Sequence, residues 1–161
     1  MHDRIPCRTT RLLLSCSVLV LMVGFTTKVD GDERAAVRTL QSIVDELRGQ
    51  LALPVEVTAS IVPTNALLVS VQPLDGRAAF QMSFQESFLD GLDADEVRTI
   101  VAHELGHVWI FTHHPYLQTE VGANDIALRV VSRQSLERVY GKVWAHQGLK
   151  GSLARFVRDP Q

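Results

Sequence analysis

Residues 93–113 read DADEVRTIVAHELGHVWIFTH, and they predict one long helix around which the rest of the chain is organised. Asp93 and Glu96 have the spacing of a capping box, in which each side chain binds the backbone N–H of the other residue. Pro115 disfavours helical geometry at the residue before it, so the helix is expected to end near His113. Between these limits, apolar residues recur at the three- and four-residue steps of a buried helix face: Val97, Ile100, Val101, Leu105 and Val108.

The sequence on the N-terminal side of this helix predicts a further helix and three strands. Residues 32–51 carry an amphipathic helical pattern, which Pro54 ends. Short apolar or alternating runs at 55–62, 66–71 and 78–84 predict strands separated by turns.

On the C-terminal side, the sequence predicts helices alone. One is expected to start near Thr119 and run to about Val131, and another is expected to be capped by Ser135 and ended by Gly148. The order of one helix, three strands and then helices indicates an α+β fold. We expect a small antiparallel sheet of about three strands packed on helices, with the 93–113 helix at the centre.

The N-terminal segment has the layout of an export signal. Three arginines precede the apolar run 12–25, which polar residues follow. As a helix, this run of 14 residues would be roughly 21 Å long, against about 30 Å for a hydrocarbon core. Residues 1–31 are therefore expected to form a signal peptide or an N-terminal membrane anchor, and residues 32–161 one domain. This predicts an extracytoplasmic protein, secreted or periplasmic, whose contact with a membrane is limited to that segment.

Composition excludes several kinds of chemistry. The formal net charge of −2 leaves no basic surplus to neutralise phosphates, so a nucleic-acid partner is not expected. The only cysteines, Cys7 and Cys16, fall in the N-terminal segment. The 32–161 domain therefore has no thiolate to offer, and it must hold any metal through histidine and carboxylate side chains.

The sequence His103-Glu104-Leu105-Gly106-His107 indicates a metal site. Residues four apart lie on one helix face, so the two imidazoles can converge on one zinc ion. Glu104 lies at a neighbouring angle, from which it can take a proton from a metal-bound water attacking a peptide carbonyl. Gly106 leaves space for an adjacent chain to pack on this helix. The pattern predicts zinc-dependent hydrolysis of peptide bonds.

A zinc hydrolase needs a third protein ligand, and two residues compete for that role. Glu120 is favoured, because it lies in the first turn of the next helix, which an antiparallel return would bring beside the metal. His113, ten residues after His103, is the alternative. On the helix of Glu120, Asn124 is expected to hydrogen-bond the free nitrogen of a ligand histidine, with Asp125 as the alternative.

These residues resemble the catalytic helices of gluzincin-type zinc metallopeptidases. The stretch 92–107 is similar to the helix that ends in the same five residues in the family of the CAAX prenyl proteases and heat-shock membrane proteases. That family then carries Glu-x-x-Ala-Asp-x-x-Ala, and residues 120–127 match this spacing with Asn124 in place of Asp. The ImmA/IrrE-type proteases carry Asn at that step. The resemblance covers roughly 88–130, and it implies a minimal zincin-like fold with Glu120 as a zinc ligand.

The resemblance also implies how a substrate could bind. The strand near 78–84 is expected to pair with an extended peptide or protein substrate through its edge. Tyr116, Tyr140 and His146 are candidates for stabilising the oxyanion, although packing explains each of them more simply. The alternative to an endopeptidase is a non-catalytic metal-binding or regulatory interaction module on the same scaffold.

Overall fold

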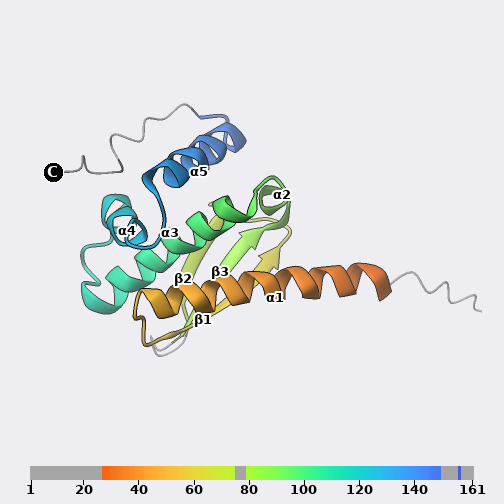
Figure 1. Cartoon of the computed structure of the whole chain (residues 1–161). Helices are drawn as coiled ribbons and strands as arrows, with labels where there is room; N and C mark the ends of the chain where they lie inside the picture. The colour runs from red at the N-terminus through yellow and green to blue at the C-terminus, as the bar shows by residue number, and fades with distance from the viewer. Residues whose placement is uncertain (1–26, 75–78, 150–155, 157–161) are drawn as a thin grey trace, which may run out of the picture.

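The computed structural model describes residues 27–74, 79–149 and 156 (Figure 1). Most of the expected export segment, residues 1–26, lies outside the described residues, and residues 27–31 belong to the first helix. In the described part of the chain, every helix is too short or too polar to cross a bilayer. The elements are α1 (Thr27–Gln50), β1 (Glu56–Val62), β2 (Val69–Pro73), β3 (Ala79–Gln85), α2 (Glu86–Leu89), α3 (Ala94–His113), α4 (Glu120–Ala127) and α5 (Arg133–His146).

The three strands form one mixed sheet in the order β1-β3-β2. β3 pairs with β2 in antiparallel fashion and with β1 in parallel fashion. The expected antiparallel sheet is therefore wrong in one of its two pairings. After β1, the chain forms β2 at the opposite edge of the sheet. It then reverses direction and forms β3 between the two, antiparallel to β2 and parallel to β1. β3 is thus the central strand of the described sheet, and both of its edges are paired.

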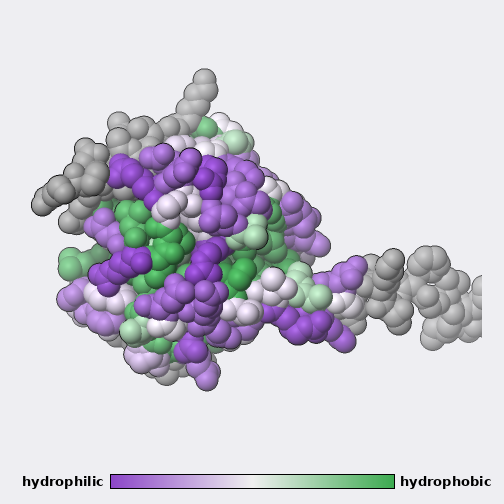
Figure 2. All heavy atoms as spheres, in the orientation of Figure 1, coloured by the Kyte–Doolittle hydropathy of each residue, from purple (hydrophilic) through white to green (hydrophobic). Residues whose placement is uncertain are grey.

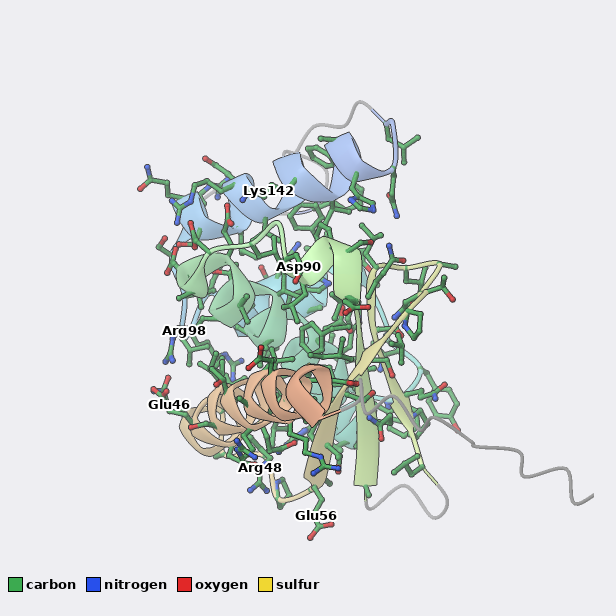
Figure 3. The ribbon with its side chains drawn as sticks, turned by 90° about the vertical axis from the view of Figure 1, so that its right-hand side faces the viewer. Glu46, Arg48, Glu56, Asp90, Arg98 and Lys142 are labelled. Carbon is green, nitrogen blue, oxygen red and sulfur yellow. The ribbon has the colours of Figure 1, made fainter. Side chains whose placement is uncertain are left out.

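Helices α1 and α3 cover one face of this sheet, which gives the fold two layers (Figures 1 and 3). In β3, Phe80, Met82 and Phe84 are buried under these helices, while Gln81 and Ser83 lie on the opposite, more polar face. The alternation follows the two-residue period of a strand with one buried side. Seen from the helical side, the surface is mainly polar, with apolar residues visible in hollows between the helices (Figure 2).

The long central helix forms as its end signals predict. The side chain of Asp93 accepts a hydrogen bond from the backbone N–H of Glu96 at 2.9 Å, and Glu96 accepts one from that of Asp93 at 2.8 Å. The helix ends at His113, two residues before Pro115. Both limits are confirmed, because they depend on local chemistry that the sequence displays directly.

Other boundaries differ from the prediction for local reasons. β2 starts at Val69 because the residues before it form a turn, in which Leu68 has a φ of 67°. α4 ends at Ala127 rather than near residue 131. The cap of α5 is Ser132, whose hydroxyl accepts from the backbone N–H of Ser135. Ser135 itself is turned toward Asp95 of α3, with a hydrogen bond of 2.7 Å.

Candidate metal centre

Two histidines on α3 direct the same ring nitrogen toward one point. His103 and His107 lie one turn apart, and their Nε2 atoms are 3.2 Å from each other. Their rings meet edge to face, with centroids 4.8 Å apart. This arrangement follows from the four-residue spacing, because such residues are neighbours on one helix face.

Gly106 allows α4 to cross α3 at close range. A Cβ atom at this position would lie 2.3 Å from the carbonyl oxygen of Ala123 and 2.9 Å from its Cα. Any side chain would clash there, so the crossing requires glycine. Thr119 caps α4 through a hydrogen bond from the N–H of Gly122. The first turn of α4 therefore lies beside the two histidines, and Glu120 belongs to that turn.

Glu120 completes a group of three potential ligands, called here the His-His-Glu group. Its Oε2 is 3.3 Å from Nε2 of His103, and its Oε1 is 3.4 Å from Nε2 of His107. Hydrogen bonds with the two imidazoles hold the pKa of the Glu120 carboxyl far below its ordinary range. Burial opposes charge on His107, but the hydrogen bond with Glu120 and the charge of Glu104 outweigh burial and raise the pKa of the imidazole.

The donor atoms of this group fit a small tetrahedral cation. One ligand atom from each residue lies within 4.8 Å of the other two. Zinc binds nitrogen and carboxylate oxygen at about 2.0–2.2 Å, so neighbouring ligands of a tetrahedral site are about 3.3–3.6 Å apart. The two Nε2 atoms are 3.2 Å apart, one oxygen of the Glu120 carboxylate is 3.3 Å from the first of them, and its second oxygen is 3.4 Å from the other, so all three separations lie close to this spacing. Two imidazoles and one carboxylate also form a ligand set that zinc hydrolases use.

Asn124 sets the orientation of His103. Its Oδ1 is 2.8 Å from Nδ1 of His103, while its Nδ2 donates to the Tyr140 hydroxyl at 2.9 Å and to the carbonyl of Phe156 at 2.7 Å. Because both amide hydrogens are engaged, Oδ1 accepts from the Nδ1–H of the ring, and the Nε2 lone pair is left for a metal. Asn124, rather than the alternative Asp125, thus occupies the position next to this ring.

Gln118 supports the second histidine, and sequence analysis missed it. Its Oε1 is 3.2 Å from Nδ1 of His107, and its Nε2 donates to the carbonyl oxygen of the same residue at 3.2 Å. The amide therefore holds both the ring and the backbone of His107. Gln118 lies in the loop between α3 and α4, directly before the cap residue Thr119. No periodic pattern in this loop marks a residue as a neighbour of α3.

The alternative third ligand, His113, lies apart from the His-His-Glu group. Its ring stacks on Trp109 with a centroid distance of 4.1 Å and an interplanar angle of 8°. Its Nδ1 is 2.8 Å from the carbonyl oxygen of Trp109. In the described part of the chain, the group of potential ligands contains Glu120 and not His113.

Glu104 is buried beside the His-His-Glu group and is only 8% exposed. Burial raises the pKa of its carboxyl, and the neighbouring His103 and His107 offset this effect only in part. The backbone N–H of Val71, in β2, hydrogen-bonds to the carboxyl group. A carboxyl with a raised pKa is suited to accept a proton near neutral pH.

One of the three candidates for oxyanion stabilisation lies at the site. The Tyr140 hydroxyl is 3.4 Å from Oε2 of Glu120, and burial raises the pKa of the phenol. Tyr116 is 98% exposed on the loop between α3 and α4, and His146 packs edge-on against Phe88. Sequence spacing could not show which of the three lies near the two histidines. Tyr140 is on α5, and its position beside α3 depends on how the two helices pack.

A cleft of about 440 Å³ opens beside the group, a volume typical of ligand sites. β2, α3 and α5 contribute residues to its lining. Among the described residues of the lining, Glu104 and Glu120 are the only acidic side chains, and there is no lysine or arginine. Away from the His-His-Glu group the walls are apolar, and they include Phe80, Phe88, Ile100, Val108, Val139 and Val143.

The fold is similar to that of a known metallopeptidase. The structure of the metallopeptidase zymogen abylysin from Pyrococcus abyssi superimposes with a TM-score of 0.51 and 13% sequence identity, over 70% of this chain and 99% of the abylysin chain. At this identity the likeness shows the fold alone, and it is compatible with a zincin-like architecture. No protein-family model and no curated protein sequence matches the chain.

Proposed function

We propose that this protein is a zinc-dependent endopeptidase of the gluzincin type. The observation that carries the proposal is the convergence of two imidazole Nε2 atoms and the two oxygens of the Glu120 carboxylate, at separations of 3.2–3.4 Å, next to one buried carboxyl group. His103, His107 and Glu120 would hold the metal, and the abylysin-like fold supports this assignment at the level of architecture. Bound zinc would supply Lewis acidity that polarises a peptide carbonyl and lowers the pKa of water.

Glu104 would act as the general base of the reaction. Its carboxyl group lies beside the His-His-Glu group, and burial raises its pKa toward the range in which proton transfer is efficient. It would take a proton from the attacking water and deliver it to the leaving amine. The hydrogen bond from the N–H of Val71 holds the carboxyl group in place. Tyr140 would donate a hydrogen bond from its hydroxyl to the substrate's carbonyl oxygen as charge develops there.

The substrate would bind along β2, rather than along β3 as the sequence suggested. The ladder bonds at Leu68 and Leu74 point toward β3. In an antiparallel pair successive residues alternate in direction, so Val69 and Val71 direct their N–H and C=O groups away from β3. Both residues line the cleft. An extended peptide could therefore pair with this edge while an apolar side chain enters the cleft.

Two finer assignments belong to the same proposal. The sequence resembles both the CAAX prenyl protease and heat-shock membrane protease family and the ImmA/IrrE-type family, with Asn124 matching the second pattern. The basic and apolar composition of residues 1–31 supports export, so the protein would act on peptide or protein substrates outside the cytoplasm.

The test is zinc content and peptide cleavage by the purified full chain, compared with two single variants. His103→Ala is expected to abolish stoichiometric zinc uptake. Glu104→Gln is expected to keep zinc and lose cleavage of casein or a peptide library. Glu137→Gln, at an exposed ion pair with Arg133 on α5, serves as the matched control with unchanged cleavage. Stoichiometric zinc together with no Glu104-dependent cleavage would refute the enzyme and favour a metal-binding interaction module.

A further inference from the structure

One buried amide joins the metal centre to Phe156, near the end of the chain. Asn124 is fully buried, and its side chain has three partners from three regions of the chain. Oδ1 accepts from His103, one Nδ2 hydrogen binds the Tyr140 hydroxyl, and the other binds the carbonyl oxygen of Phe156 at 2.7 Å. The last bond is the shortest of the three, and it spans 32 positions of sequence.

Phe156 is held at this place by its ring as well as by its carbonyl. The ring stacks on Tyr140 with a centroid distance of 5.6 Å and an interplanar angle of 18°. Trp144, one turn later on α5, lies 6.3 Å away from the same ring. Phe156 therefore contacts α4 through a hydrogen bond and α5 through aromatic packing.

The identity of residue 124 fits this contact. The amide of asparagine has two N–H donors, and both are needed for the Tyr140 hydroxyl and the Phe156 carbonyl. An aspartate could still accept from His103, but it would turn an oxygen toward the carbonyl oxygen of Phe156. The carbonyl oxygen of Phe156 would then lose its donor and face a second acceptor, which costs free energy. Asn124 and the carbonyl of Phe156 are thus chemically matched.

We propose that Phe156 is a positioning residue for the metal centre, acting through Asn124 on His103. The carbonyl of Phe156 fixes which way the Asn124 amide faces, so Oδ1 stays on the Nδ1–H of His103 and the ring keeps Nε2 toward the ligand group. The carbonyl of Phe156 is thus the last member of a hydrogen-bonded chain that runs through Asn124 to His103. This inference rests on the proposed metal site and not on peptide hydrolysis.

The experiment compares the full chain with a chain that ends after Leu149 and thus lacks Phe156. In the metal-free proteins, the ¹⁵N shifts of the His103 ring report which nitrogen carries the proton. The full chain is expected to give one tautomer, protonated at Nδ1, and the shortened chain a mixture. Zinc affinity, measured by competition with a chelator, is expected to fall roughly tenfold, as for other losses of support behind a ligand histidine.

Two variants separate positioning from general destabilisation. Phe156→Ala keeps the carbonyl but removes the stacking, so it is expected to give an intermediate loss of affinity with an unchanged fold. A chain ending after Arg158 keeps Phe156, and it is expected to match the full chain. Trp144 fluorescence reports in each case whether residue 156 is docked.

A double-mutant cycle with Asn124→Asp tests the chemical match. In the Asn124→Asp background Phe156 should no longer dock, so shortening the chain should change neither the ring shifts nor the zinc affinity. Unchanged His103 shifts on shortening the wild-type chain would overturn the proposal. If shortening changes the His103 shifts but the full chain takes up no zinc, the positioning role stands and the proposed function is refuted.

Discussion

The two edges of the sheet are closed in different ways, and the difference bears on where the proposed substrate would enter. At the β1 edge, the amide of Gln41 from α1 donates to the carbonyl of Val57 at 2.9 Å and accepts from the N–H of Ala59 at 2.8 Å. At the β2 edge, the N–H of Val71 binds the Glu104 carboxyl group. One edge is thus occupied by a neutral helix side chain and the other by the proposed general base.

This contrast has a physical basis in how sheets avoid unwanted pairing. A free edge offers unpaired N–H and C=O groups to any extended chain, and proteins usually cover such edges. Gln41 satisfies a donor and an acceptor of β1 at once, which blocks a peptide from pairing at that point. Glu104 satisfies only a donor of β2, and the outward groups of Val69 remain directed into the cleft. In the described part of the chain, this difference supports the proposal that a substrate would pair with the β2 edge.

The largest expected effect comes from changing the side chain that closes the β2 edge. Glu104→Gln keeps an acceptor for the N–H of Val71, so the fold, the zinc and this contact should remain. It removes the group that accepts a proton, and loss of such a group lowers rates by about 10²–10⁴-fold. Cleavage of a fluorogenic peptide, with zinc content measured in parallel, checks this. Retained cleavage would remove Glu104 from the mechanism.

The β1 edge should respond in stability and not in activity. Gln41→Ala leaves the carbonyl of Val57 and the N–H of Ala59 without their side-chain partner, and an unsatisfied buried group costs about 1–3 kcal/mol. Urea unfolding should show that loss, while kcat of the folded enzyme should not change. Ser42→Ala, one position along the same helix and exposed, is the control. Equal unfolding midpoints for the two variants would show that Gln41 does not protect this edge.

A backbone change at β2 tests whether a peptide pairs with it. Val69→Pro removes an N–H that points away from β3, so the sheet should persist while one hydrogen bond to the substrate is lost. Such a bond is worth about 1 kcal/mol, which corresponds to a rise in KM of roughly fivefold to tenfold. Val69→Ala shortens the side chain but keeps the N–H, and it should leave KM nearer to that of the wild type. An equal rise in both would assign the effect to the side chain.

The sequence predicted those features that local chemistry encodes. The limits of α3 follow from Asp93, Glu96 and Pro115, and the facing of the two histidines follows from their spacing. It did not predict the pairing of β3 between β1 and β2, because strand order depends on how the chain returns. Supports for the site from distant segments were missed for the same reason. Gln118 and Phe156 carry no periodicity that marks them as neighbours of α3.

The smallest expected effect concerns the attachment of α1, the helix that closes the β1 edge. Arg98 of α3 binds Glu46 of α1 through two contacts of 2.9 Å at the surface (Figure 3). The hydrogen bond from Arg98 lowers the pKa of Glu46. A lowered carboxyl pKa contributes stability at pH values above the ordinary pKa of glutamate, and that stability is lost as the pH falls through the lowered pKa.

Because exposed pairs contribute little, Glu46→Gln should reduce the melting temperature slightly at pH 7, and the difference from wild type should vanish at acidic pH. A large difference at pH 7 would mean that this ion pair holds α1 against α3 more strongly than an exposed pair is expected to do.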